Sequence, residues 1–314
     1  MSGAPSAIEQ AAQDALVRGS SSFSAAARLL PRQTRSSVTL LYAWCRYCDD
    51  VVDGQVSGSR DLAPEPDALV RLDGLRRDTL AALNGAPPSP VFAALATVAA
   101  RHGLEADLFL EHLEGYAMDV DGRRYETLPD LLVYCHRVAG VVGLMMARIM
   151  GVEDKATLAR AADLGLAFQL TNIARDVVDD ARAGRIYAPR AWLEEAGLSA
   201  GSITDAGSAP AVAELRRRLV LAAEPYYDSA RIGVQALPRR AGLGIGAALN
   251  IYRRIGTKLV EAGPAAQEVR ISTGKREKLA ELGRAVISVA RPRSLPGAVP
   301  PAPPSPYRQT SAFP

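Results

Sequence analysis

Cysteine, histidine and aromatic residues are scarce in this chain of 314 residues, and each shortage argues against a class of protein. The cysteines number three, an odd and small count that argues against a disulfide framework and indicates a reducing compartment. Cys45 and Cys48 form a CxxC pair, but no second pair and no neighbouring histidine completes the four ligands that zinc needs. A zinc or redox site is therefore not expected.

A strong excess of one charge and long apolar runs are also missing. Basic and acidic residues number 37 and 34, without a basic stripe interleaved with aromatics, so no nucleic-acid partner is expected. The first residues include acidic side chains and no long apolar core, which argues against a signal peptide. The run Val138 to Met150 contains Arg148 and is shorter than the ~20 residues that span a bilayer. We therefore expect a cytoplasmic protein that contacts a membrane only peripherally, on the inner face of the cell membrane.

Alanine and leucine are abundant and alternating β-branched runs are scarce, and both features favour helices. The periodicity predicts helices over residues 8–18, 34–52, 68–83, 91–102, 106–118, 128–150, 155–180, 211–236 and 242–262, with a shorter one after Arg276. Eight of the 21 prolines lie between Pro292 and Pro314, where no core can be buried. We predict one all-α domain over residues 1–288 and a proline-rich disordered tail over residues 289–314.

Two of the predicted helices carry acidic stripes on otherwise apolar surfaces. Over the segment Leu40 to Asp53, at ~100° per residue, four side chains fall within about 60° of one another: Tyr42, Arg46, Asp49 and Asp53. In helix 155–180, four side chains fall within about 80°: Gln169, Asn172, Asp176 and Asp180. Carboxylates four residues apart repel by about 0.2–0.5 kcal/mol on an exposed helix, and by more when partly buried. Each stripe therefore predicts a neighbouring cation.

The cation could be a metal ion or an arginine or lysine of the protein itself. Ligands that are all oxygen favour Mg²⁺, which binds one or two carboxylates together with substrate phosphates and water. Two facing DxxxD stripes suit a Mg²⁺–diphosphate site, although a solvated helix face would explain either stripe alone. A di-iron bundle would need Glu-x-x-His pairs, and an EF-hand would need a loop glycine and a closing glutamate, which the stripes lack. Asp50 and Asp179 point ~80–100° away from the stripes and are expected to pair with arginine or water.

Five segments that include these stripes resemble the signatures of the squalene and phytoene synthase family. They are LLYAWCRYCDDVVD, GYAMDVDGRRY, YCHRVAGVVGLMMARIMG, LGLAFQLTNIARDVVDDARAGRIYAP and EPYYDSA. The resemblance extends from about Gly19 to Lys278 and is greatest to the bacterial phytoene synthases. It implies a single-domain helical bundle of the isoprenoid synthase type with a central active-site cavity.

The resemblance implies a Mg²⁺-dependent prenyltransferase of carotenoid biosynthesis, of the 15-cis-phytoene synthase type. The implied reaction is the head-to-head (1′-1) condensation of two geranylgeranyl diphosphates to phytoene through prephytoene diphosphate. Mn²⁺ is an alternative metal, no NADPH is expected, and contact with other carotenoid enzymes is expected. The alternative is a dehydrosqualene or squalene synthase that uses farnesyl diphosphate. A helical scaffold protein would have lost the aspartates, and a terpene cyclase or chain elongase fits the DxxxD spacing less well.

The resemblance also assigns roles to individual residues. The implied catalytic residues are Asp49, Asp53, Tyr134, Asp176 and Asp180. The implied metal ligands are Asp49, Asp53, Asp119, Asn172, Asp176 and Asp180. The implied substrate-binding residues are Ser20, Ser22, Tyr42, Arg46, Gln169, Asn172, Arg185, Tyr187, Tyr252 and Arg270. Many bacterial members have Ser-Lys-Ser-Phe near the N-terminus, and here Ser21 replaces the lysine, which removes one basic diphosphate contact.

Three of these features keep a structural alternative. Arg46 could neutralise Asp50 one turn away instead of binding phosphate. Tyr134 could be a core aromatic residue instead of a cavity hydroxyl. Gly140 and Gly143 could allow close helix packing, or they could make room for a prenyl chain.

Overall fold

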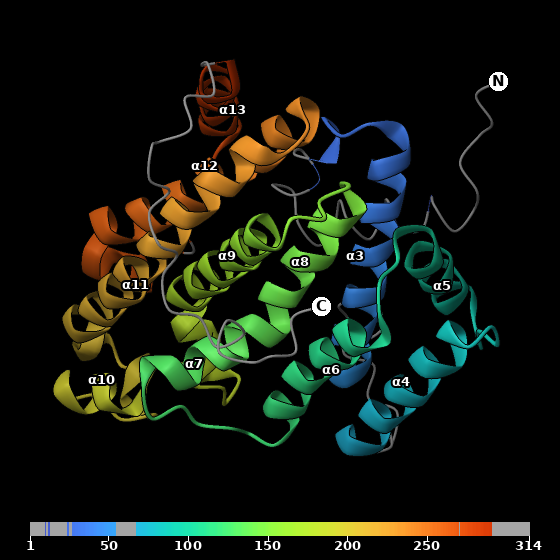
Figure 1. Ribbon diagram of the computed structural model, residues 1–314. Helices are drawn as coiled ribbons and strands as arrows, with labels where there is room; N and C mark the ends of the chain where they lie inside the picture. Colours follow the sequence, from blue (N-terminus) through green and yellow to red (C-terminus); the bar gives the residue numbers. More distant parts are fainter. Residues whose placement is uncertain are drawn as a thin grey trace.

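The computed structural model describes Gln10, Ala12, Ser24 and residues 27–54, 67–269 and 271–290, which form helices joined by loops (Figure 1). The α-helices are α3 (Arg32–Val52), α4 (Ala68–Leu83), α5 (Pro90–His102), α6 (Ala106–Val120), α7 (Leu128–Cys135), α8 (Val141–Ile149), α9 (Lys155–Arg182), α10 (Arg190–Glu195), α11 (Ala209–Ala236), α12 (Arg239–Ala262) and α13 (Lys275–Ala290). The same described residues also contain one π turn, η1 (His136–Gly140), and three 3₁₀ turns, η2 (Ser202–Thr204), η3 (Ala206–Ser208) and η4 (Gly263–Gln267). Within the described residues there is no strand, which confirms the all-α class.

The helix boundaries follow capping signals in the sequence. α7 begins with a capping box, in which the side chains of Thr127 and Asp130 each accept a hydrogen bond from the other's backbone N–H. The carboxylate of Asp154 caps α9 by accepting from the Thr157 N–H at 2.8 Å. α12 begins directly after Pro238, somewhat earlier than predicted, and the short α10 was not predicted. The predicted tail overlaps the last two residues of α13, and the rest of it lies outside the described residues.

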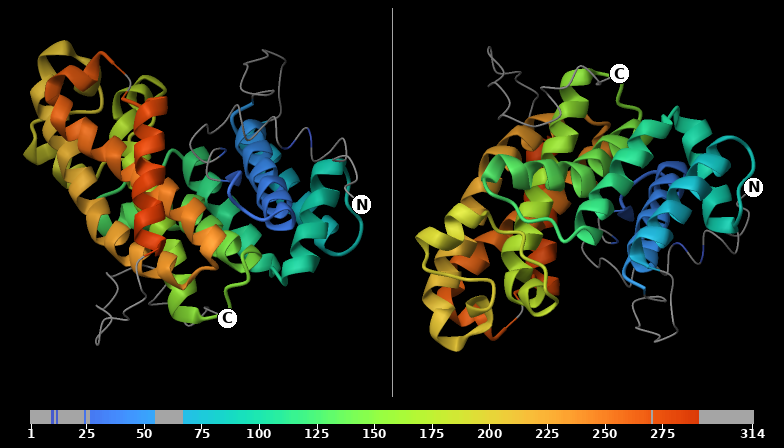
Figure 2. Two further views of the ribbon diagram at one scale, coloured as in Figure 1. Left: turned by 90° about the horizontal axis from the view of Figure 1, so that it is seen from above. Right: turned by 90° about the horizontal axis from the view of Figure 1, so that it is seen from below.

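α9 lies at the centre of the molecule and packs against α8, α11 and α12 (Figure 1). Views from above and below show α3–α6 on one side of the molecule and α9–α13 on the other, with α7 and α8 between them (Figure 2). Two clusters of buried side chains match these halves. One contains Trp44 and Phe109, and the other contains Leu170 and Tyr227. The helix formed by α7, η1 and α8 lies between the two halves and can therefore form a wall between them.

α7, η1 and α8 form one continuous helix with a face that repeats every four residues. Its members along the cavity described below are Tyr134, Val138, Val142, Met146 and Met150. In a straight α-helix, a four-residue step advances ~400°, so such a face would drift by about 40° per step. The π turn accommodates one extra residue and turns the face back in the middle of the helix. One helix can therefore line the cavity along its whole length.

The π turn is packed tightly between α6 and α9. A Cβ on Gly165 of α9 would lie 2.2 Å from the carbonyl oxygen of Ala139, so only glycine fits there. On the other side, Nδ1 of His112 lies 3.2 Å from the carbonyl oxygen of Arg137. A π turn shifts the backbone ladder from the i−4 to the i−5 carbonyl, and the return to the α pattern leaves one carbonyl to be satisfied elsewhere. His112 supplies that partner.

The continuous helix over residues 128–149 is long and apolar enough to cross a bilayer by length and composition alone. In this fold it packs against α6 and α9, and 56 % of its most apolar window is buried inside the protein. Core helices of this kind pass the same test, so the helix is explained by its place in the core.

Candidate active site

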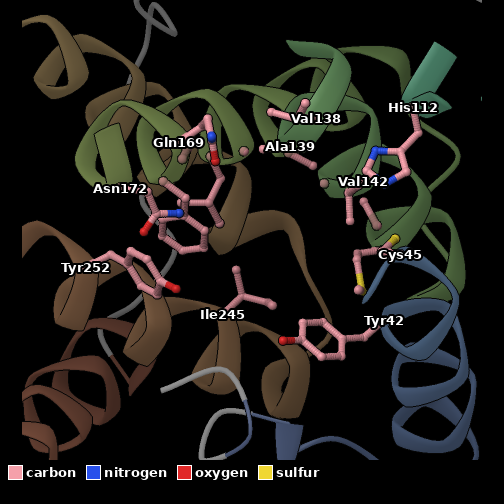
Figure 3. A pocket seen from close by; sticks show the side chains of 18 of the residues that line it. Tyr42, Cys45, His112, Val138, Ala139, Val142, Gln169, Asn172, Ile245 and Tyr252 are labelled. Carbon is pink, nitrogen blue, oxygen red and sulfur yellow. The ribbon is translucent and has the colours of Figure 1, made fainter. Parts of the chain in front are cut away.

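A cavity of about 750 Å³ lies between α3, α6, α8, α9 and α12. Figure 3 shows Tyr42 and Cys45 entering it from α3, Gln169 and Asn172 from α9, and Tyr252 from α12. The face of α7–α8 described above forms an apolar wall of the same chamber. The volume falls within the ~300–1,000 Å³ that is usual for small-molecule sites. The predicted central cavity is therefore present.

The first acidic stripe lies near the C-terminal end of α3, where Asp49 lines the cavity. Arg46 donates to Asp49 at 2.7 Å and also contacts Asp50 at 2.6 Å. Burial raises the pKa of Asp49 to about 6; the Arg46 charge opposes this effect and the Asp53 charge adds to it. Arg46 thus makes the predicted pair with Asp50 and still lines the cavity.

The second acidic stripe lies in the C-terminal half of α9. Nε of Arg175 donates to Oδ1 of Asp176 at 2.8 Å, and Arg175 also lines the cavity. The pKa of Asp180 is raised to about 7, first by burial and then by the charge of Asp176. Asp179 points away from the stripe and pairs with Arg182 at 3.2 Å, as expected.

Asp119 of α6 connects the stripes to the loop 183–189 that follows α9. The Tyr134 hydroxyl donates to one Asp119 oxygen at 3.0 Å, and the Tyr187 hydroxyl donates to the other at 2.9 Å. Burial raises the pKa of Asp119, while these two hydrogen bonds and the nearby Arg185 lower it. Arg185 itself donates to Asp53 of α3. The loop is therefore fastened to two helices on the far side of the cavity.

The two stripes share one electrostatic environment. The charge of Asp53 raises the pKa of Asp119, and the charge of Asp119 raises the pKa of Asp180. Arg185 lowers the pKa of Asp49 in the first stripe and of Asp180 in the second. The carboxylates of α3 and α9 are thus coupled electrostatically through Asp119 and Arg185.

The oxygen atoms of this region fit a hard cation. Oδ1 of Asn172 is buried without a hydrogen-bond partner, and a cation or a donor would satisfy it. In the described part of the chain, no three His, Cys, Asp or Glu side chains converge closely enough to hold one ion. The six predicted ligands are therefore not gathered around one point. Mg²⁺ needs no such cage, because it takes one or two carboxylates and completes its shell with phosphate and water.

The other predicted residues fall into three groups. Tyr42, Gln169 and Tyr252 line the cavity, and Tyr252 stacks on Phe168 with the ring centroids 4.2 Å apart. Tyr134 is buried and also lines the cavity, so it is both a core aromatic residue and a cavity hydroxyl. The stripe residues that are absent from the cavity lining are Asp53, Asp176 and Asp180. The predicted residues outside the described part of the chain are Ser20, Ser22 and Arg270, together with Ser21.

Both explanations for the glycines of the cavity wall apply to Gly143. A Cβ on Gly143 would lie 2.4 Å from the carbonyl oxygen of Ala161, and Gly143 also lines the cavity. A Cβ on Gly140 would lie 2.6 Å from Nδ1 of His136, which makes close packing the reason for glycine there.

Several polar residues of the cavity were not predicted from the sequence. They include Cys45, His112, Tyr116, Arg160, Arg175 and Lys278. Arg175 precedes Asp176 directly, so its place beside the second stripe could have been inferred. Arg160 lies near the N-terminal end of α9 and donates to the Ser229 hydroxyl of α11 at 3.1 Å. No local sequence pattern predicts a contact between residues so far apart in the chain.

The fold and the cavity define an all-helical isoprenoid synthase. A crystal structure of a dehydrosqualene synthase superposes with a TM-score of 0.78 at 26% identity, covering 89% of this chain and 95% of that one. The squalene/phytoene synthase family model matches residues 16–277, and the chain belongs to this family. It is 52% identical to the 15-cis-phytoene synthase of Paracoccus sp., over 91% of this chain and 92% of the relative. It is also 52% identical to the 15-cis-phytoene synthase of Enterobacter agglomerans, over 88% of this chain and 96% of the relative.

Proposed function

We propose that this chain is a phytoene synthase, which condenses two geranylgeranyl diphosphates head to head to phytoene through prephytoene diphosphate, in carotenoid biosynthesis. The supporting observation is one chamber that joins an apolar wall to the carboxylates of Asp49 and Asp119, from α3 and α6, and to the guanidinium groups of Arg46, Arg175 and Arg185. Two relatives that are half identical to this chain carry the name 15-cis-phytoene synthase. The matched regions cover 92% and 96% of these two relatives.

The proposed metal is Mg²⁺, with Mn²⁺ as an alternative, held by carboxylates of the two stripes and by Oδ1 of Asn172. When bound, it supplies positive charge to the diphosphate leaving group. Arg46, Arg175 and Arg185 line the cavity, and in this proposal they bind the diphosphate oxygens. The wall of α7–α8 holds the prenyl chains and excludes water, which would otherwise quench an allylic cation.

Tyr134 and Tyr187 keep their protons in this site. Burial and the neighbouring Asp119 carboxylate raise the pKa of both phenols. Both hydroxyls donate to Asp119, and their rings are stacked with centroids 4.9 Å apart. They therefore act as fixed donors that orient the Asp119 carboxylate beside the stripes.

We also propose that the protein works in the cytoplasm, in peripheral contact with the inner face of the cell membrane and with other carotenoid enzymes. The proposed product is a hydrocarbon without a polar group, so its transfer into water is strongly unfavourable. Release into a bilayer, or to an enzyme bound there, avoids that transfer.

Product analysis tests the proposed function. The purified protein is incubated with Mg²⁺ and either geranylgeranyl or farnesyl diphosphate, without NADPH, and the extracted lipid is chromatographed. We expect phytoene from geranylgeranyl diphosphate and no product when the metal is removed with EDTA. A clear preference for farnesyl diphosphate would instead favour the dehydrosqualene or squalene synthase alternative.

A further inference from the structure

The loop 183–189 is held across the cavity by contacts between distant parts of the chain. Arg185 donates to Asp53 of α3, and Tyr187 donates to Asp119 of α6 at 2.9 Å. At its base the loop is fixed to α9, because the Arg185 N–H bonds the Asp180 carbonyl at 2.8 Å. Gly184 turns the chain there with a φ of +80°, which favours glycine. The position of the Arg185 guanidinium is therefore set by three helices.

Among the described residues, Arg185 is a cation that acts on both acidic stripes: its guanidinium pairs with Asp53, and its charge lowers the pKa of Asp49 and of Asp180. The other arginines near the stripes are engaged locally: Arg46 with Asp49 and Asp50, and Arg175 with its neighbour Asp176. Arg185 comes instead from outside both stripes and pairs with Asp53 across the cavity. Asp53 is only 21 % exposed, so a bare charge there would be costly without a partner. The protein thus supplies its own counter-ion at a carboxylate that is also a predicted metal ligand.

We propose that Arg185 is a resident counter-ion of the metal site, which holds Asp53 until the metal and a diphosphate arrive together and then exchanges Asp53 for the diphosphate. This inference rests on the proposed function, because it concerns the same carboxylates. A guanidinium binds carboxylate and phosphate with the same two-pronged geometry, so the exchange keeps its hydrogen bonds. The Tyr187–Asp119 hydrogen bond keeps the loop over the cavity while Arg185 changes partner.

The exchange makes the two ligands depend on each other. In the absence of diphosphate, the metal must displace Arg185 from Asp53, and this competition weakens metal binding. A diphosphate draws Arg185 away from Asp53 and frees the carboxylate for the metal. By thermodynamic linkage, the diphosphate then strengthens metal binding by the same factor as the metal strengthens diphosphate binding. Arg185 therefore acts on the metal through Asp53, as a positioning residue.

The test is a calorimetric titration of the full chain with Mg²⁺ alone, and then with inorganic pyrophosphate at saturating Mg²⁺. In Arg185→Gln we expect Mg²⁺ alone to bind about fivefold more tightly or better, while pyrophosphate binds more weakly. Arg182→Gln is the matched control. Arg182 lies three positions before Arg185 and carries the same charge, but it forms an exposed ion pair with Asp179. We expect its affinities to stay close to those of the unaltered protein.

Two results would overturn the inference. If the Arg185→Gln variant binds Mg²⁺ alone no more tightly than the unaltered protein does, Arg185 does not compete with the metal for Asp53. An equal gain in Mg²⁺ affinity in the Arg182→Gln variant would show that the effect comes only from the change in net charge. Since the titrations need no turnover, they stand apart from the product analysis. Circular dichroism and melting curves of both variants check that each is folded.

Discussion

At the scale of single residues, the site is a set of carboxyl groups kept in an unfavourable environment. Burial and neighbouring charges raise the pKa of Asp49 to about 6 and of Asp180 to about 7, from an ordinary value of 3.8. The side chain of Asp49 keeps 40 % of its exposure, so solvent screens it and Asp180 dominates the effect. Such groups release their protons to solvent when a metal cation binds to them.

These raised pKa values predict how stability depends on pH without metal. The folded protein binds more protons than the unfolded chain, so the contribution to stability is fully present below about pH 4 and is lost as pH rises through 6 and 7. Melting temperatures in EDTA should therefore fall over that range, and Mg²⁺ should bind more tightly as pH rises. Asp49→Asn combined with Asp180→Asn should flatten both trends. A metal-free melting temperature that rises steadily from pH 4 to 7 would contradict this account.

At the scale of elements, the cavity depends on one helix with a π turn in its middle. The turn keeps the face of every fourth residue directed to the cavity, and it is wedged between α6 and α9. On one side His112 donates a hydrogen bond to the Arg137 carbonyl. On the other side Gly165, which has no Cβ, leaves room for the Ala139 carbonyl. Because both contacts are made to backbone carbonyls of the π turn, the wall cannot shift easily to accept a larger residue.

Gly165→Ala is the substitution that tests this packing. The added Cβ would lie 2.2 Å from the Ala139 carbonyl oxygen, so one of the two helices must move. We expect a loss of about 1–3 kcal/mol in the free energy of unfolding, measured in urea, despite the better helix propensity of alanine. Gly207→Ala is the control, because no atom lies within 4 Å of the added Cβ. Equal stability of the two variants would show that the wall can yield.

At the scale of the whole molecule, local and distant relationships differ in how far the sequence predicts them. The acidic stripes follow from helix periodicity alone, because residues four apart share a face whatever the fold. Several helix boundaries follow from capping residues, which are equally local signals. The pairing of Arg185 with Asp53 joins residues 132 positions apart, and nothing near either residue announces it. The π turn was also missed, because an apolar run shows its length but not a single inserted residue.

The central claim is that carboxylates of two facing helices bind a metal–diphosphate pair, and turnover of Asp49→Asn and Asp176→Asn tests it most directly. Each variant is assayed with geranylgeranyl diphosphate and Mg²⁺, and the phytoene formed is measured against the unaltered protein. Loss of a direct metal ligand should lower turnover at least about 100-fold, while circular dichroism shows an intact fold. Near-normal turnover in either variant would contradict the account.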